Sequence, residues 1–424
     1  MNRHPDPDGP HGPSGMEWSP GRHSALLTGD YLFSQLIPYI GNKRKLLGLI
    51  AQAIAATGEA PPRTDFIDLF AGTGVVSRLA KRLGFRVLCN DWEPYSEQIN
   101  RCHIVQSRAP VFHGGRSYEQ VMAELNALPP LEGWITRHLC PDDDVHYDTA
   151  RDRMFYMRKN GMRIDAIRAQ IARWEHDGLL DAEQKACLLA PLLYSASYNS
   201  NTSGLFKGFH HGWGGRTGTA LYRIAADLAL RPAAFIDNGH ENRVLRMDAH
   251  ALADTLAGEV GEAAIAYIDP PYNQHPYGAN YHVLNTIALW DSPPLAPKIT
   301  GRDKAAICQD WRTERRSPYN HRRQALAAYR HLLSVLDTRW IATSYSTDGF
   351  IALRDMLQAN CERGAVQVFT RPYKRYRVSR QRYSTRPMTL EFVVLTNTRR
   401  PPQRTADELW HEITTLETSL NDAS

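Results

Sequence analysis

The sequence is poor in several features that would assign it to a special class of protein. Its six cysteines include no Cys-x-x-Cys pair, so neither a disulfide framework nor a zinc site is expected. No apolar run approaches the roughly 20 residues of a membrane-spanning helix. Residues 1–30 contain no apolar signal-peptide core. These absences predict a soluble, cytoplasmic protein with free thiols and no membrane partner.

The chain also lacks a strong charge of one sign. Lys and Arg number 50 and Asp and Glu number 45, which gives a formal net charge of +5. This balance is compatible with a polyanionic partner but does not require one. With 42% hydrophobic and 22% charged residues, the composition is that of an ordinary globular protein, and 424 residues suffice for two or three domains.

One stretch, residues 263–273, organises the rest of the chain. An apolar run of buried-strand length ends abruptly in Asp269-Pro270-Pro271-Tyr272. Two consecutive prolines remove two backbone donors and fix two φ angles, so a stiff, extended loop should follow the strand. The loop would present a carboxylate, a carbonyl and an aromatic ring where open α/β sheets bind ligands. Taken alone, the motif is equally compatible with a simple proline-rich turn.

A glycine turn lies upstream of this motif. Residues 65–74, DFIDLFAGTG, predict a buried strand that runs into a Gly-x-Gly turn, with a helix over 75–83. Gly72 and Gly74 permit a tight turn and a close approach to a ligand. Ser77 stands where a dinucleotide-binding turn has its third glycine, which favours a smaller adenosyl ligand.

An acidic residue and a basic segment frame the glycine turn. A strand predicted over 86–90 ends in Asp91, which could accept hydrogen bonds from ribose hydroxyls or cap the next helix. Residues 38–47, PYIGNKRKLL, lead into a predicted helix that ends near Ala56, and Lys43 lies at its start. This segment is either a ligand contact or a solvated basic helix start.

From about residue 101 to 245 the alternation of strand and helix lapses. A glycine-rich run at 203–218 carries Lys207 and Arg216 among aromatic residues and histidines, and we expect a flexible loop suited to phosphates and base edges. His210 and His211 are adjacent, but no carboxylate or cysteine stands at ligand spacing, so no metal site is predicted.

The last third of the chain predicts further strands. They cover 339–345, 366–370 and 389–396, and a crossover helix over about 320–336 precedes the first of them. The polar and aromatic segment 273–297 is expected to be a loop over the mouth of the site.

The loop between the last two strands is strongly basic. Residues 371–386 hold seven Lys or Arg, three Tyr and no acidic residue. This composition favours phosphate binding over a plain solvated hairpin. The candidate DNA-binding residues in it are Lys374, Arg375, Arg377, Arg380 and Arg382.

Three motifs in fixed order now carry a family resemblance. They are Tyr39-Ile-Gly-Asn-Lys43, Phe70-Ala-Gly-Thr-Gly74 and Asp269-Pro-Pro-Tyr272. The chain resembles the Dam-like D12 (alpha) class of S-adenosylmethionine-dependent DNA N6-adenine methyltransferases. The resemblance implies an α/β fold, namely the Rossmann-like class I methyltransferase sheet of seven strands with one reversed strand, plus an inserted target-recognition domain.

The resemblance also divides the chain. It implies a catalytic domain split between 31–100 and 241–400 and a target-recognition domain at 101–240. Composition adds a disordered tail at 1–30 and a closing helix and tail at 401–424.

By the same resemblance, residues around the pocket take specific roles. Those carried over to the methyl donor are Tyr39 and Lys43 at its methionine end, Phe70, Gly72 and Gly74 at its floor, Asp91 at its ribose and Asp248 at its adenine. S-adenosylhomocysteine would be the product. Double-stranded DNA is the expected partner, together with a possible cognate restriction endonuclease.

The chemistry of the catalytic motif agrees with this assignment. The N6 lone pair of adenine is delocalised into the ring, so the amine is a poor nucleophile. Hydrogen bonds from N6 to Asp269 and to the carbonyl of Pro270, held rigid by Pro271, would favour the transition state over the ground state. Tyr272 can stack on the base, which must first be flipped out of the duplex.

Three alternatives remain open at this point. N4-cytosine methylation usually comes with Ser rather than Asp before Pro-Pro-Tyr in such enzymes. The same basic and aromatic loops could bind an RNA substrate as well as DNA. A non-catalytic nucleic-acid-binding protein on a degenerate methyltransferase fold would also look similar, although its motifs need not be intact.

Overall fold

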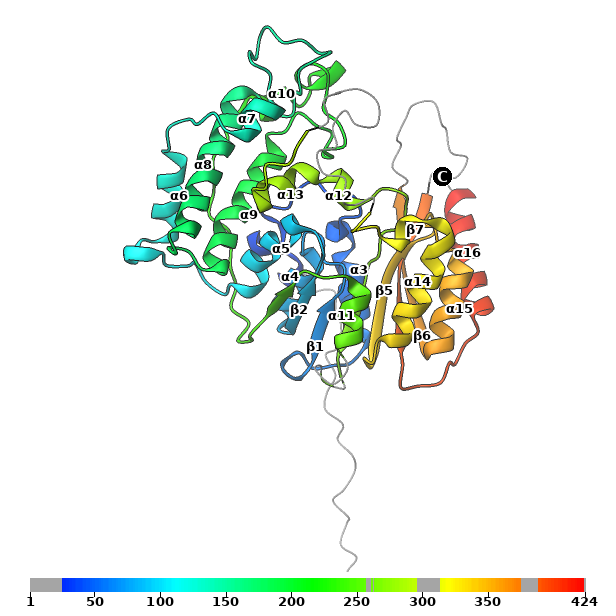
Figure 1. Ribbon diagram of the computed structural model, residues 1–424. Coiled ribbons are helices and arrows are strands. Elements are labelled where there is room, and N and C mark those ends of the chain that lie inside the picture. Colours follow the sequence, from blue (N-terminus) through cyan, green and yellow to red (C-terminus); the bar gives the residue numbers. More distant parts are fainter. Residues whose placement is uncertain (1–24, 257–260, 262, 296–312, 375–387, 423–424) are drawn as a thin grey trace, which may run out of the picture.

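A single twisted sheet forms the centre of the fold. The computed structural model describes residues 25–256, 261, 263–295, 313–374 and 388–422 (Figure 1). Its seven-stranded sheet has the order β3-β2-β1-β4-β5-β7-β6. The strands are β1 (Asp65–Asp68), β2 (Arg86–Asn90), β3 (Arg243–Leu245), β4 (Ile265–Ile268), β5 (Trp340–Ser346), β6 (Ala365–Lys374) and β7 (Met388–Asn397). Only β7 runs against its neighbours, so the predicted sheet with one reversed strand near its edge is confirmed.

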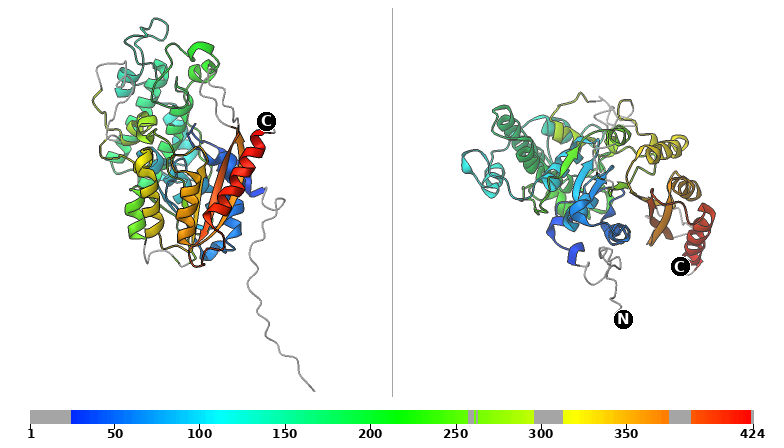
Figure 2. Two further views of the ribbon diagram at one scale, coloured as in Figure 1. Left: turned by 90° about the vertical axis from the view of Figure 1, so that its right-hand side faces the viewer. Right: turned by 90° about the horizontal axis from the view of Figure 1, so that it is seen from below.

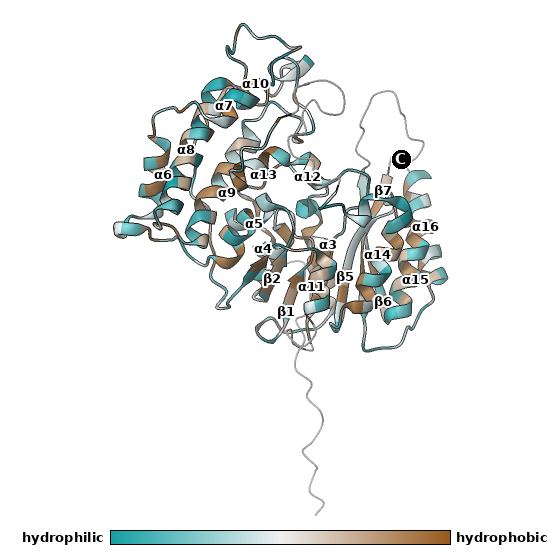
Figure 3. Cartoon of the chain, in the orientation of Figure 1, coloured by the Kyte–Doolittle hydropathy of each residue, from teal (hydrophilic) through white to brown (hydrophobic). Residues whose placement is uncertain are grey.

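The sheet is covered on both faces, which explains why its central strands are apolar throughout. Successive residues of β4 point to opposite faces: Ile265 and Tyr267 pack under α3 and α4, whereas Ala266 and Ile268 pack against the helices of the other face. Figure 2 shows the two helical layers, and Figure 3 shows the strands as an apolar layer between them. The helices are α2 (Asp30–Phe33), α3 (Leu47–Ala56) and α4 (Val75–Leu83) on one face, and α11 (Ala249–Thr255), α14 (Arg322–Val335), α15 (Leu353–Arg363) and α16 (Ala406–Asp422) on the other.

The region between β2 and β3 is helical and has its own core. Its helices are α5 (Pro94–Asn100), α6 (Tyr118–Asn126), α7 (Trp134–Leu139), α8 (Arg158–His176), α9 (Ala182–Tyr198) and α10 (Leu221–Ala225). Their apolar faces gather in one buried cluster. α6 and α9 each begin at a capping box, with Ser117 and Asp181 as the N-cap residues.

The segment after β4 differs from the prediction. Residues 273–297 were expected to be a loop, but the structure has α12 (Tyr277–Asn280) and α13 (His282–Leu289) there. Val283, Leu284 and Ile287 are fully buried in the cluster of the inserted helices. Their helical spacing was present in the sequence, but the prolines and polar residues on both sides concealed it.

Short single-turn helices complete the described chain. They are η1 (Ala25–Leu27), η2 (Lys43–Leu46), η3 (Pro61–Arg63), the π-helical η4 (Arg101–Val105), η5 (His113–Gly115), η6 (Gly215–Thr217) and η9 (Pro318–Asn320). Most of the tail predicted for residues 1–30 lies outside the described residues. The predicted closing helix is confirmed as α16, in which Leu409 and Ile413 are buried. None of the described helices is long and apolar enough to cross a bilayer.

Candidate active site at the carboxyl ends of the central strands

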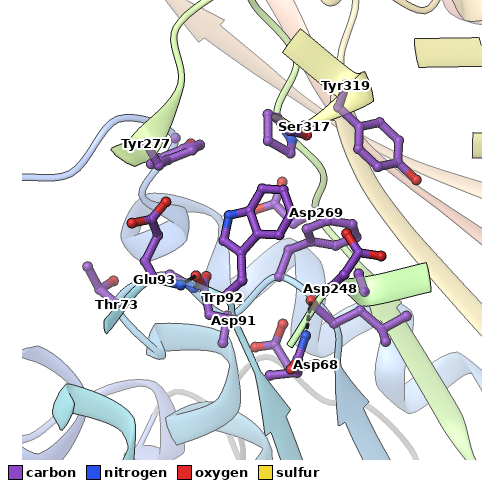
Figure 4. A pocket seen from close by; sticks show the side chains of 18 of the residues that line it. Asp68, Thr73, Asp91, Trp92, Glu93, Asp248, Asp269, Tyr277, Ser317 and Tyr319 are labelled. Carbon is purple, nitrogen blue, oxygen red and sulfur yellow. Dashed lines mark hydrogen bonds between the residues drawn. The ribbon is translucent and has the colours of Figure 1, made fainter. Parts of the chain in front are cut away.

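A pocket of about 940 Å³, measured with its open mouth, lies where β1, β2 and β4 end. Because parallel strands end at the same edge of the sheet, it collects the polar residues that follow each of them. Figure 4 shows the carboxyl groups of Asp68, Asp91, Asp248 and Asp269 around it. The site residues predicted from the sequence that line it are Tyr39, Lys43, Phe70, Gly72, Asp91, Asp248, Asp269 and Pro271.

The glycine turn is fixed by side chains from α5. Gly72 and Gly74 have φ angles of +52° and +74°, in the left-handed region that favours glycine. The carbonyl of Gly72 accepts hydrogen bonds from Ser96 Oγ at 2.6 Å and Asn100 Nδ2 at 3.2 Å. Gly74 is the N-cap residue of α4. The turn therefore holds a ligand-accessible backbone in one conformation.

The missing third glycine also has a physical explanation. Ser77 is fully buried, and its hydroxyl donates a hydrogen bond of 2.7 Å to Asp68 Oδ2. Burial raises the pKa of Asp68 to about 7, and the bond from Ser77 opposes that rise. Ser77 thus serves to hold a buried carboxyl group beneath the pocket.

Asp91 braces the pocket rather than capping a helix. Its Oδ2 accepts the N–H of Gly72 at 2.8 Å, and its Oδ1 accepts the N–H of Glu93 at 2.9 Å. Burial raises the pKa of Asp91, and these backbone donors partly offset the effect. Asp248 is the N-cap residue of α11, and it accepts the N–H groups of His250 and Ala251.

A compact charge cluster surrounds the predicted catalytic residue. Lys43 Nζ lies 3.0 Å from Asp269 Oδ1 and donates a hydrogen bond of 2.7 Å to the hydroxyl of Tyr272. Burial raises the pKa of Asp269 to about 6, although the positive charge of Lys43 lowers it. Burial would lower the pKa of Lys43, but Asp269 and Tyr272 outweigh it and keep the ammonium charged.

A stack of tyrosines fixes the orientation of Tyr39. Its ring lies 5.0 Å from that of Tyr277 and 4.9 Å from that of Tyr281, centroid to centroid. Its hydroxyl accepts a hydrogen bond of 3.0 Å from the hydroxyl of Tyr95. Tyr277 also lines the pocket. Sequence reasoning singled out only Tyr39. The segment 273–297, which contains Tyr277 and Tyr281, was expected to cover the mouth of the site as a loop, and no contact with Tyr39 was foreseen.

Sequence reasoning also missed the segment 315–320, which contributes Arg315 and residues 317–320 to the lining of the pocket. Arg315 forms an ion pair of 2.9 Å with the buried Glu93. Tyr319 packs edge-on to Phe70, with ring centroids 5.5 Å apart. Asn320 Nδ2 donates to the carbonyl of Asn273, just after the catalytic motif, at 2.7 Å. The only available signal was the turn sequence Ser-Pro-Tyr-Asn at 317–320.

The glycine-rich run of the insert contacts the segment after Tyr272 through the backbone of Phe206 and through the side chain of Lys207. Lys207 Nζ lies 3.0 Å from His275 Nδ1, close behind Tyr272, and Arg216 is exposed in η6. The expectation that the aromatic residues of this run face a ligand is wrong for Phe209, which is 8% exposed and packs in the core of the insert. Trp213 is also drawn inward, since its Nε1 donates to the carbonyl of Asp144 at 2.8 Å.

Most of the second basic loop, residues 371–386, lies outside the described residues. Lys374 is the last residue of β6. Arg375, Arg377, Arg380 and Arg382 lie outside the described residues. Within the described part of the chain, no three His, Cys, Asp or Glu side chains are arranged to hold a metal ion.

Comparison with known proteins bears on the chemistry of this pocket. Residues 39–341 match the family described as D12 class N6 adenine-specific DNA methyltransferase. The chain is 30% identical over 344 residues to the type II methyltransferase M.NlaIII of Neisseria lactamica, which covers 81% of this chain and 93% of the relative. It is 28% identical over 342 residues to the type II methyltransferase M.FokI of Planomicrobium okeanokoites, covering 80% of this chain and 49% of that longer protein. The type II methyltransferase M.CviAII of Paramecium bursaria Chlorella virus 1 is 27% identical over 343 residues, 80% of this chain and 93% of the relative.

Proposed function

The chain belongs to the family of D12 class N6 adenine-specific DNA methyltransferases, and we propose that Asp269, Pro270, Pro271 and Tyr272 carry out its reaction. The family and the similarity to type II methyltransferases make it a site-specific DNA methyltransferase that acts on N6 of adenine. The family assignment argues against N4 of cytosine as the methyl acceptor, against RNA as the substrate and against a non-catalytic role. The observation that carries the proposed assignment is the buried ion pair of Asp269 at the wall of the pocket.

Enzymes of this kind use a methyl donor, and S-adenosylmethionine fits the residues present. A Cβ atom at Gly72 would lie 2.7 Å from Tyr39 Cε1, so the turn leaves a cradle that only glycine permits. Asp68 Oδ1, in the wall of the pocket, is buried and accepts no hydrogen bond from the described residues. When bound, the donor supplies an electrophilic methyl group on a sulfonium, whose C–S bond breaks as the bond to N6 forms.

We assign the residues around the donor by their place in this pocket. Tyr39 would contact its methionine end, with Lys43 beside it at the catalytic carboxylate. The carboxylate of Asp91 would accept hydrogen bonds from the ribose hydroxyls of the donor. The carboxylate of Asp248 would accept one from its adenine amine. The floor would be formed by Phe70 and Gly72, with Gly74, the N-cap residue of α4, supporting the turn from outside the pocket lining.

The catalytic residues act on the target base. The carboxylate of Asp269 and the carbonyl of Pro270 accept hydrogen bonds from N6, which localises the lone pair on nitrogen. After transfer N6 carries one proton too many, and that proton leaves to Asp269 or to water. The Asp269 side chain is only 15% exposed, so an adenine stacked in a duplex cannot reach it. The target base is therefore flipped out of the helix before transfer.

The proposed mechanism predicts an acid limb in the pH dependence of methylation. Burial raises the pKa of Asp269 to about 6, so its carboxylate takes up a proton at a higher pH than an ordinary Asp does. A protonated carboxyl stabilises the developing positive charge on N6 poorly, so kcat/KM should fall roughly tenfold per pH unit below that pKa. Initial rates on duplex DNA at saturating S-adenosylmethionine check this.

Two other carboxyl groups could imitate that limb and need controls. Burial raises the pKa of Glu93 and that of Asp68 each to about 7. A limb near pH 7 that disappears in Glu93→Gln or in Asp68→Asn would identify the substituted residue as its source. A limb near pH 4 in the wild type would contradict the role of Asp269.

We further propose that the insert, residues 101–240, holds DNA through Lys207 and Arg216. The basic residues Lys374, Arg375, Arg377, Arg380 and Arg382 are proposed to bind DNA phosphates as well. Removing one cation from a DNA phosphate should reduce the slope of log affinity against log salt by about 0.9. Lys207→Gln and Arg216→Gln should each show this reduction in fluorescence anisotropy with a labelled duplex. Arg330→Gln on α14 is the control, and a slope unchanged in both test variants would contradict the proposal.

The DNA sequence that the enzyme recognises can be measured directly. Methylation assays on duplex DNA, with sequencing of the modified positions, would give the recognition site. Because the relatives include type II methyltransferases, we propose that a restriction endonuclease of the same specificity accompanies this enzyme.

A further inference from the structure

A third charged side chain, Glu391, lies on the reversed strand beside the contacts of Tyr272. The ring of Tyr272 packs edge-on against Tyr345 of β5, with centroids 5.1 Å apart, and Tyr345 is paired with Phe392 of β7. Glu391 of β7 lies opposite Ser346 of β5. The next two residues on its face of the sheet, Val393 and Leu395, are fully buried in the core under α3 and α4. A glutamate at the head of this apolar row has no evident role in the packing of the sheet.

The carboxyl group of Glu391 has an unused acceptor. Its Oε2 is buried and accepts no hydrogen bond from any described residue. Burial raises the pKa of Glu391, and the positive charge of Lys43 is the main influence that opposes this rise. Glu391 in turn acts on both Lys43 and Asp269 through its charge. Lys43 is thus in ion-pair contact with Asp269, and its charge also acts on Glu391.

The ammonium group of Lys43 interacts with two groups of the catalytic motif at once. It donates to the Tyr272 hydroxyl at 2.7 Å and faces Asp269 Oδ1 at 3.0 Å. An adenine amine needs the same carboxylate to accept its hydrogen bond. While Lys43 is drawn fully to Asp269, it competes with N6 for that acceptor and neutralises the charge that should polarise the amine.

We propose that Glu391 is a positioning residue that draws the Lys43 ammonium away from Asp269 when the target adenine enters. The ammonium then gives its third N–H to the unused oxygen of Glu391, keeps its bond to Tyr272, and leaves Asp269 to accept from N6. This inference rests on the proposed role of Asp269 and adds a residue that lies outside the three family motifs.

The variant Glu391→Gln tests the proposal because it removes the charge and keeps the shape. We expect kcat to fall about tenfold, with KM for S-adenosylmethionine little changed, since the fault lies in the alignment of N6 rather than in donor binding. The acid limb of the pH profile should move to lower pH. Asp269 loses a negative neighbour and becomes the sole carboxylate partner of Lys43, and both effects lower its pKa.

Further variants distinguish a positioning role of Glu391 from a purely structural one. Glu391→Asp keeps the charge, so its acid limb should stay at the wild-type pH although kcat is reduced. Thermal unfolding should show no loss of stability in Glu391→Gln, because the replaced carboxylate oxygen has no hydrogen-bond donor among the described residues. Glu412→Gln, on the exposed face of α16, is the control for loss of one negative charge.

The outcomes are distinguishable. An unshifted acid limb in Glu391→Gln, with Asp269→Ala inactive, would overturn the role of Glu391 alone. Activity in Asp269→Ala would overturn the proposed catalytic assignment on which this inference rests. If Glu391→Gln does not fold, a wild-type kcat in Glu391→Asp would overturn the proposal.

Discussion

Replacing Asp269 by Ala should reduce methyl transfer to adenine by roughly 10³-fold, because one preorganised electrostatic group is removed from the transition state. The dissociation constant for S-adenosylmethionine should stay within about threefold of the wild-type value, since the group acts on the transition state rather than on ground-state binding. Methylation of duplex DNA with a labelled donor and calorimetry of donor binding measure the two quantities. Full activity would contradict the assignment.

Two further variants sharpen this experiment. Asp269→Asn keeps the shape and one acceptor but loses the charge, so its activity should lie nearer to that of Asp269→Ala than to wild type. Asp337→Ala removes an exposed carboxylate before β5, at the opposite end of the sheet from the pocket. It should retain wild-type activity. If all three variants lose activity equally, the loss reflects folding rather than chemistry.

Local sequence signals predicted the sheet well because each was complete within a few residues. The apolar run before Asp269 and the Gly-x-Gly turn each combine a strand with an abrupt change of backbone character. The strands β1 and β4 can be recognised from these local patterns alone, although the turn after β1 is also held by Asp91, Ser96 and Asn100 from outside the segment. The reversed strand was harder to predict, because the sequences of β6 and β7 do not indicate the direction in which either strand runs. Its place near the edge of the sheet was inferred from the family resemblance.

The charge cluster could not be read from the sequence in the same way. Lys43 and Tyr272 are 229 positions apart, and only the fold brings them within 2.7 Å. Glu391 stands in a strand pattern as an ordinary solvent-facing residue. The pattern of a strand specifies which residues share a face, but it does not specify which distant charge that face meets.

The wrong expectation for residues 273–297 shows a third limit. A helix that packs against another domain needs only one apolar stripe, here Val283, Leu284 and Ile287. Polar neighbours such as His282 and Asn285 suggested a loop, yet both are buried and hydrogen-bonded to distant residues, Phe206 and Glu93. Their partners were invisible in the sequence.

Replacing Gly74 by Ala should destabilise the donor pocket more than any other substitution that adds a single methyl group there. The new Cβ would lie 1.8 Å from Asn100 Oδ1, and φ is +74°. Asn100 is buried and donates hydrogen bonds to Gly72 O and Ser96 Oγ, so it cannot move without releasing the turn. We expect the free energy of unfolding to fall by about 3 kcal/mol and donor binding to be lost.

The chain offers a matched control for that prediction. Gly58 has a nearly equal φ of +70°, but a Cβ there would meet no atom within 4 Å. Gly58→Ala therefore carries the backbone strain alone, at about 1 kcal/mol, and should bind S-adenosylmethionine normally. Chemical denaturation of both variants isolates the clash as the difference between them. Adding Asn100→Ala to Gly74→Ala should restore part of the stability, because it removes the atom that the new methyl group meets. Equal losses in Gly74→Ala and Gly58→Ala would show instead that the turn yields freely and that Asn100 does not fix it.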